Sequence, residues 1–111
     1  MLPKKKSASS DQPERRRLSQ AYMGALRALA EHHYANQRYT RALELLQRAL
    51  RVDNLLEDLH CQSMRVYAAL GDRAGLVRQY QELKDVLHGE LDMQPLETTN
   101  RLYERLLVSA E

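Results

Sequence analysis

Cys61 and His60 are the one neighbouring pair whose types could support nucleophilic catalysis. A thiol nucleophile needs a base that faces it, and that base is in turn oriented by a third group. Adjacent residues of a helix point about 100° apart, so these two side chains do not face each other. No Gly-rich phosphate loop and no other Ser, Asp or Glu constellation accompanies them. The sequence therefore predicts a protein that is not an enzyme and uses no cofactor.

Histidine and cysteine also suggest a metal site, and the chain has four histidines and one cysteine. No His-x3-His or Cys-x2-Cys spacing is present, and the adjacent His32 and His33 point in different directions on a helix. We therefore expect histidines that serve packing or the surface, and no bound metal.

Positive charge is concentrated at the start of the chain. Residues 1–17 contain six basic and two acidic residues, a net charge of +4, whereas residues 18–111 carry −2. Affinity for nucleic acid comes mainly from Lys and Arg contacts to phosphate, so the −2 body is a poor polyanion binder. The weak candidates for nucleic-acid contacts are Lys4, Lys5, Lys6, Arg15, Arg16 and Arg17. The alternative interpretation is a solvated linker.

The composition favours a cytoplasmic protein. A single cysteine cannot form an internal disulfide, which fits a reducing compartment. No run approaches the roughly 18–20 apolar residues of a membrane span. Polar residues 7–11 follow the lysines at positions where a signal peptide needs an apolar segment. We therefore expect no membrane contact.

Helical spacing of apolar residues begins after a polar segment. Residues 1–12 are interpreted as a disordered arm or linker, and residues 13–111 as one folded domain. The first helix is predicted at about Glu14–Ala35. Steps of 4, 4, 3 and 4 place five of its residues on one face: Leu18, Tyr22, Leu26, Leu29 and His33. The other four helices are predicted at about Tyr39–Val52, Leu55–Leu70, Arg73–His88 and Leu96–Ser109.

Turn and cap residues separate these segments. Asn54 and Glu57 have the spacing of a capping box at the start of the third helix. Gly71 and Asp72 form a predicted turn, and Gly89 is well placed to end the fourth helix. Five helices joined by short turns describe antiparallel helical hairpins.

An offset of 34 residues relates two helix pairs. With this offset, Ala42 corresponds to Leu76, and the break at residues 37–38 corresponds to the turn at residues 71–72. This offset is the period of tetratricopeptide repeats. Each pair has an apolar face that it cannot bury alone, so pairs stack. The predicted fold is an all-α, tetratricopeptide-like right-handed stack of antiparallel helix hairpins. Its five helices include a C-terminal helix that caps the second pair.

The concave face of such a stack is lined by the first helix of each pair. The candidate groove residues are Arg27, Glu31, Tyr34, Asp58, Cys61 and Arg65. They predict a mixed-charge groove that accepts a peptide or a helix of another protein. The plain alternative is that Arg27–Glu31 and Glu31–Arg65 are surface ion pairs, which contribute little energy.

Several segments resemble the bacterial transcriptional activator domain. They are residues 41–50, 55–60, 67–73, 90–95 and 101–107. The most specific part is a Glu-Leu-x-x-x-Pro loop that leads into Arg-Leu-Tyr-Glu-Arg-Leu-Leu, and the resemblance covers residues 14–108. Asn54, Asp92 and Leu96 replace the family's usual Pro, Gly and Ser. Asp92 can still adopt a left-handed backbone.

The resemblance implies a non-enzymatic protein-interaction or oligomerisation module of a bacterial transcription regulator. In this family the domain usually follows a winged-helix DNA-binding domain, and none fits in residues 1–17. We therefore expect an excised domain or a stand-alone relative. Its partner is a protein or a second copy of itself in a homodimer, and DNA is reached only through a winged helix absent from this chain. The alternative is a generic tetratricopeptide-type scaffold or adaptor, unrelated to transcription, that binds a peptide or helix in its groove.

Overall fold

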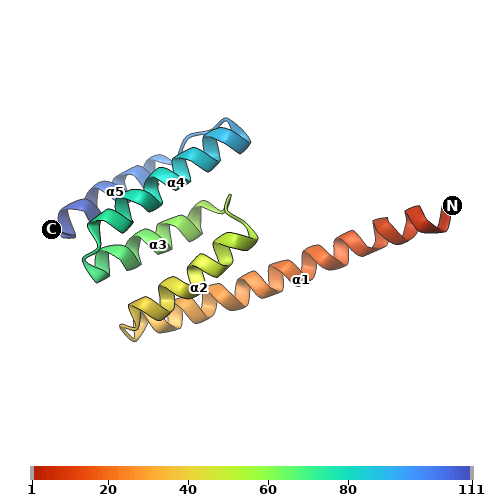
Figure 1. The fold of residues 1–111 in the computed structure, drawn as a ribbon, viewed down its shortest axis with the longest axis horizontal. Helices are drawn as coiled ribbons and strands as arrows, with labels where there is room; N and C mark the ends of the chain where they lie inside the picture. The colour runs from red at the N-terminus through yellow and green to blue at the C-terminus, as the bar shows by residue number, and fades with distance from the viewer. Residues whose placement is uncertain (1, 111) are drawn as a thin grey trace.

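Five helices form where apolar residues recur at helical spacing. The computed structural model describes residues 2–110, with the side chains of residues 13–110. The helices are α1 (Leu2–Ala35), α2 (Tyr39–Val52), α3 (Glu57–Leu70), α4 (Arg73–Leu91) and α5 (Glu97–Ser109). The described residues contain no strand. Figure 1 shows α2, α3 and α4 side by side in chain order, and the prediction of an all-α fold is confirmed.

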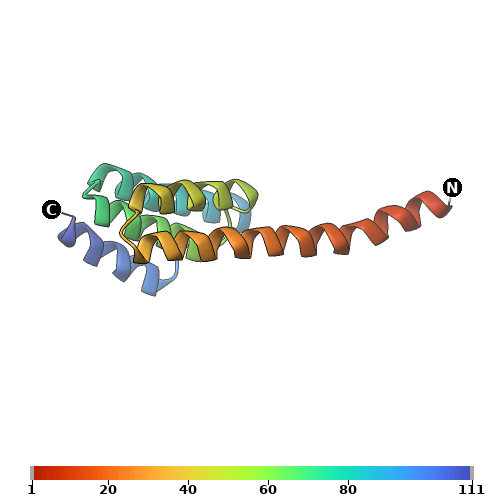
Figure 2. The ribbon, with the colours of Figure 1, turned by 90° about the horizontal axis from the view of Figure 1, so that it is seen from below.

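The helices form a tetratricopeptide-like stack of antiparallel hairpins. α1 packs on α2, α2 on α3 and α3 on α4, while α5 packs mainly on α3 and also touches α4. In Figure 2, α2 and α4 lie along one side and α1 and α5 along the other, with α3 between them. The molecule is 61 Å long because α1 continues far beyond the end of α2.

Two apolar clusters hold the stack together. The first joins α1, α2 and α3 and includes Leu26, Leu46 and Leu59. The second joins α3, α4 and α5 through Met64, Leu76 and Leu102. α3 therefore contributes to both clusters, and α5 covers the second pair as predicted.

The buried face of α1 differs from the predicted one. The buried residues are Met23, Leu26 and Ala30. Three residues of the predicted face are instead exposed: Leu18 (66%), Tyr22 (46%) and Leu29 (48%). α1 carries two apolar series at helical spacing, and α2 and α3 cover only one of them.

α1 also begins earlier than predicted. It starts at Leu2 rather than near Glu14 and continues through Pro13. The backbone of residues 2–12, interpreted above as an arm or linker, is therefore helical in this structure. The side chains of Lys4, Lys5 and Lys6 lie outside the described residues. In contrast, α2 has the predicted bounds, Tyr39–Val52.

The predicted capping box at the start of α3 is wrong. Leu56 occupies the N-cap position and makes no side-chain cap. Asp53 Oδ1 instead accepts the backbone N–H of Leu55 at 3.0 Å. Glu57 Oε2 accepts the N–H of Leu96 at 2.8 Å, because the loop before α5 lies against the start of α3. The Glu57 carboxylate thus accepts a backbone N–H at the start of α5, where the apolar side chain of Leu96 forms no cap.

A residue in the left-handed backbone conformation lies shortly before α4, and another lies directly after it. Gly71 (φ 72°) ends α3, and Asp72 then caps α4 by accepting the N–H of Gly75 at 2.9 Å. α4 runs through Gly89, which was predicted to end it, and stops at Leu91. Asp92 (φ 52°) follows in the left-handed conformation that its short polar side chain tolerates.

A buried chain of hydrogen bonds links three helices. His60 is fully buried, and its Nε2 lies 2.8 Å from the carbonyl oxygen of Asn54. Its Nδ1 lies 2.8 Å from Nε2 of Gln79, whose Oε1 accepts from Gln47 at 3.3 Å. Because the Gln79 amide donates to Nδ1, the ring proton lies on Nε2, which donates to the carbonyl oxygen of Asn54. The chain ties α2, α3 and α4 to the α2–α3 loop.

Replacing Gly75 by Ala should lower the free energy of unfolding by about 1–3 kcal/mol. The added Cβ would lie 2.3 Å from Tyr67 Cδ1 and 2.8 Å from Asp72 Oδ2, the carboxylate that caps α4. Gly89→Ala is the matched control, because it also lies within α4 and its Cβ would meet nothing within 4 Å. The control should gain about 0.5–1 kcal/mol. Urea unfolding followed by circular dichroism measures both, and equal midpoints would contradict the close approach of α3 and α4.

Replacing Gln79 by Leu should cost about 1–3 kcal/mol, because buried His60 Nδ1 loses its donor. Gln47→Leu removes only the outer bond of the chain, which is longer and partly buried, and should cost at most about 1 kcal/mol. Thermal unfolding of the two variants compares them. Similar losses of stability in the two variants would show that the hydrogen bond to His60 contributes no more than the one between Gln47 and Gln79.

Candidate functional site

The inner sides of α1 and α3 carry matching rows of polar residues. On α1 the spacing i, i+4, i+7 gives Arg27, Glu31 and Tyr34. On α3 the same spacing gives Asp58, Gln62 and Arg65. Arg27 and Asp58 are 31 positions apart, and so are the two pairs that follow. Each of these residues of α1 therefore lies opposite the residue of α3 that follows it by 31 positions. The sequence repeat that relates the two helices is 34 residues.

An ion pair closes one end of this interface. The Arg27 guanidinium donates to the Asp58 carboxylate, which joins α1 to α3. Their side chains remain 39% and 53% exposed, so water and salt screen the pair. The pair fixes the alignment of the two rows more than it stabilises the fold.

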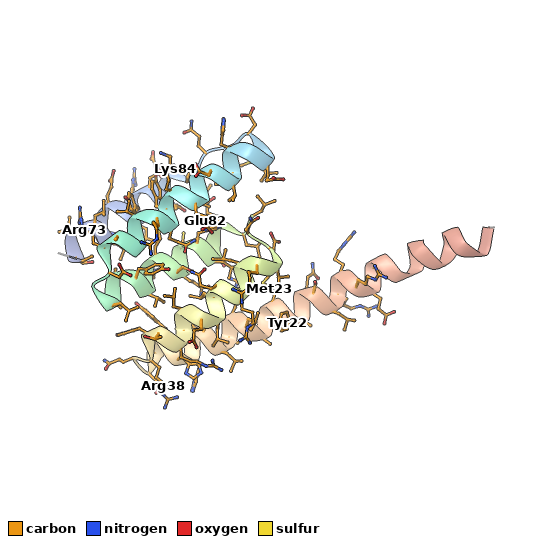
Figure 3. The ribbon with its side chains drawn as sticks, in the orientation of Figure 1. Tyr22, Met23, Arg38, Arg73, Glu82 and Lys84 are labelled. Atoms are coloured by element: carbon orange, nitrogen blue, oxygen red, sulfur yellow. The ribbon has the colours of Figure 1, made fainter. Side chains whose placement is uncertain are left out.

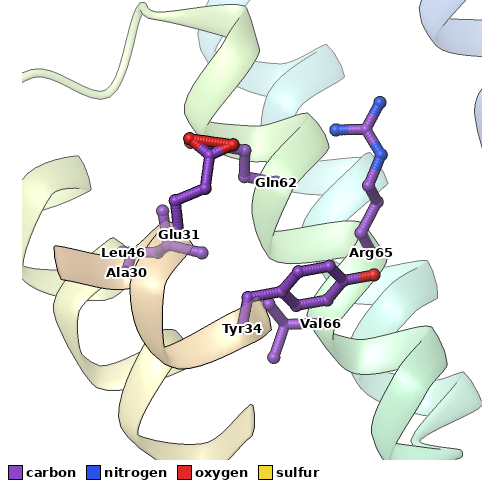
Figure 4. Close-up of a pocket in the computed structure, with 7 residues that line it drawn as sticks. All are labelled: Ala30, Glu31, Tyr34, Leu46, Gln62, Arg65 and Val66. Carbon is purple, nitrogen blue, oxygen red and sulfur yellow. The ribbon is translucent and has the colours of Figure 1, made fainter. Parts of the chain in front are cut away.

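A pocket of about 60 Å³ lies one turn further along. Its apolar floor consists of Ala30, Leu46 and Val66. Its rim is formed by Glu31 and Tyr34 from α1 and by Gln62 and Arg65 from α3. Figure 4 shows the Glu31 carboxylate beside Gln62 at one end of the pocket, and the Tyr34 ring near Arg65 at the other. Three of the predicted groove residues, Glu31, Tyr34 and Arg65, are thus brought together.

The polar groups of the rim have unused bonding capacity. Gln62 Oε1 is buried and accepts no hydrogen bond from any described residue. Within the described part of the chain, neither Glu31 nor Arg65 takes part in an ion pair, so the surface pairs considered above do not form. Buried acceptors normally have a donor. The rim can therefore accept an N–H group at its Glu31 end and donate to an oxygen at its Arg65 end.

Cys61 lies outside this pocket. Its Sγ is 3.5 Å from Thr99 Oγ1, so the side chain is directed at α5. Burial raises the pKa of the Cys61 thiol, and the Thr99 hydrogen bond opposes this only in part. Sequence reasoning reached Cys61 by adding the repeat offset to Arg27, and it missed Gln62. The signal that identifies Gln62 is the i, i+4, i+7 row that it forms with Asp58 and Arg65.

The histidines have structural surroundings. Both ring nitrogens of His60 are engaged in the buried chain, so the ring does not serve Cys61 as a base. Burial lowers the pKa of His33, and the nearby Arg38, His32 and Arg41 lower it further. Among the described residues no three His, Cys, Asp or Glu side chains come together in a group that could hold a metal ion.

Three basic residues near the start of the described side chains of α1 are exposed. Arg15, Arg16 and Arg17 lie on its surface before the first buried residue, Met23. The other three candidates for nucleic-acid contacts, Lys4, Lys5 and Lys6, lie outside the described side chains. No helix in the described part of the chain is both long enough and apolar enough to cross a membrane.

Comparison of the chain with known proteins identifies its family. The family described as "Bacterial transcriptional activator domain" matches residues 2–107. The chain is also similar to the motility hub protein FimV from two strains of Pseudomonas aeruginosa, with 40% identity over 57 residues in each case. That segment is 51% of this chain and only 6% of the length of those relatives. No solved structure matches significantly. Because the family match covers nearly the whole chain, the chain belongs to the bacterial transcriptional activator domain family.

Proposed function

We propose that this chain is a non-enzymatic protein-interaction or oligomerisation module of a bacterial transcription regulator. Its partner is a peptide or a helix that lies in the groove between α1 and α3. Family membership supports the regulatory role. The observation that carries the groove is the α1–α3 pocket, in which Gln62 Oε1 is buried without a donor beside an apolar floor.

The chemistry of the rim specifies the segment that it binds. Glu31 and Gln62 offer two acceptors side by side, which suit the ammonium or guanidinium of a partner Lys or Arg. The Tyr34 ring lies at the same groove and can pack against the stem of such a side chain. Arg65 at the other end suits a carboxylate or a backbone carbonyl. A segment in which a basic residue is followed by an acidic or carbonyl group would provide partners for Glu31, Gln62 and Arg65.

The FimV similarity supports a second candidate function. The matched relative is described as a motility hub protein, not as a transcription regulator. A helical repeat with the same groove serves equally as a scaffold or adaptor with no link to transcription. The two candidates differ in what adjoins this segment in the full-length protein. A winged-helix domain before it supports the first, and a motility-hub context supports the second.

Glu31→Gln should weaken binding of groove ligands by about two- to fivefold, because a partly exposed ion pair with a basic ligand residue is lost. The probe is a displayed library of random short peptides selected on the unmodified protein. Enriched peptides are then measured by fluorescence anisotropy. We expect the enriched set to contain Lys or Arg at one shared position.

The matched control is Glu44→Gln on α2, which removes the same charge from a residue paired only with Arg41 on the outer surface. Its affinity for the selected peptides should equal that of the unmodified protein. Equal affinities for Glu31→Gln as well, or no enrichment of basic residues, would place peptide binding elsewhere and overturn the groove assignment.

A further inference from the structure

The outer face of α1 is apolar along about three turns, and no other described helix covers it. The face consists of Leu18, Ala21, Tyr22, Ala25, Ala28 and Leu29, all of which are exposed. We call these six residues the outer stripe. They recur at the spacing of a helix face that packs on another helix. In Figure 3, Met23 is directed into the bundle, whereas Tyr22 lies on the solvent side.

Charge is absent from the outer stripe. Between residues 18 and 30 the only charged residue is Arg27, and it points to α3, where it pairs with Asp58. A surface helix normally carries charged residues on the side away from its core. An uninterrupted apolar face of this length marks an interaction surface.

The opposite end of the stack does not match this surface. The outer side of α5 carries Arg101, Glu104 and Arg105 around an exposed Val108. Stacking α5 of one copy on α1 of the next would bury those charges against the outer stripe, at a cost in desolvation. Head-to-tail association is therefore disfavoured, and the apolar face is best covered by an identical face.

We propose that the outer stripe is the contact of an antiparallel homodimer, in which α1 of one copy packs on α1 of a second copy. The two-fold register that interleaves the stripes places Leu18 on Leu29 of the other copy, and Tyr22 on Ala25. Two leucines then meet each other, Tyr22 meets a small side chain, and the alanines allow the two helices to approach closely. Such a contact uses the same patch on both copies and closes after two.

Charge decides the direction of the pair. Parallel packing would place the Arg15–Arg17 triplets of both copies side by side. The antiparallel register separates them by about 20 Å along the axis, which is beyond the screening length at physiological salt. It also places the arginines near the negative, C-terminal end of the other copy's α1 dipole.

This inference deepens the oligomerisation side of the proposed function and rests on the chain being an interaction module. The outer stripe lies on the opposite side of α1 from Ala30 and Leu46 of the pocket. Dimerisation and peptide binding are therefore measured separately, so a failure of the dimer leaves the groove assignment to its own test.

The first experiment measures mass by sedimentation and light scattering over a range of concentrations. The unmodified chain should rise from 12.9 kDa to twice that value. Leu18→Glu and Leu29→Glu should keep the mass at that of one chain, while Val108→Glu, at a more exposed site on α5, should still dimerise. Circular dichroism confirms that each variant remains folded, as expected for exposed positions.

The second experiment tests direction by disulfide formation in a Cys61→Ser background. A mixture of Leu18→Cys and Leu29→Cys chains should cross-link to each other, and neither variant alone should. Cross-linking of Leu18→Cys with itself would indicate a parallel pair and overturn the proposal. A chain that is monomeric at all concentrations, or a dimer insensitive to Leu18→Glu and Leu29→Glu, overturns it too. A monomer that co-sediments with vesicles of phosphatidylglycerol would assign the stripe to a lipid surface instead.

Discussion

The structure depends on α3, which packs into both apolar clusters. α3 contributes Leu59 and Val66 to the cluster with α1 and α2, and Met64 to the cluster with α4 and α5. Between the two clusters lies buried His60, whose two nitrogens bind Asn54 and Gln79. Apolar packing alone would allow the hairpins to slide, because it is not directional. The hydrogen bonds of His60 are directional and leave one alignment in which all of its partners are satisfied.

That alignment also creates the groove. Once α3 is fixed against α2, its row Asp58, Gln62 and Arg65 faces the matching row of α1. The Arg27–Asp58 pair closes one end, and the apolar floor keeps the helices far enough apart for a small pocket. The polar atoms left without partners at its rim follow from this spacing.

α1 therefore presents two surfaces with different chemistry. Its inner side is polar and irregular, with charges of both signs, which suits recognition of a particular segment. Its outer side is apolar and regular, which suits a second helix of the same kind. An antiparallel pair of α1 helices leaves the inner side of each copy open. The combination would give one dimer two grooves that face away from each other.

The sequence by itself determined the order of the helices, most of their bounds and the family to which they belong. Local chemistry accounts for this: Gly71 and Asp72 specify a turn through backbone freedom and capping, and α2 has one apolar stripe with no competitor. Only the tertiary structure decided which face of α1 is buried, because Leu18, Tyr22 and Leu29 have the same periodicity as the residues that α2 actually covers. It likewise decided that Arg27 faces Asp58 rather than Cys61, since the register between two helices depends on their packing and not on the repeat length.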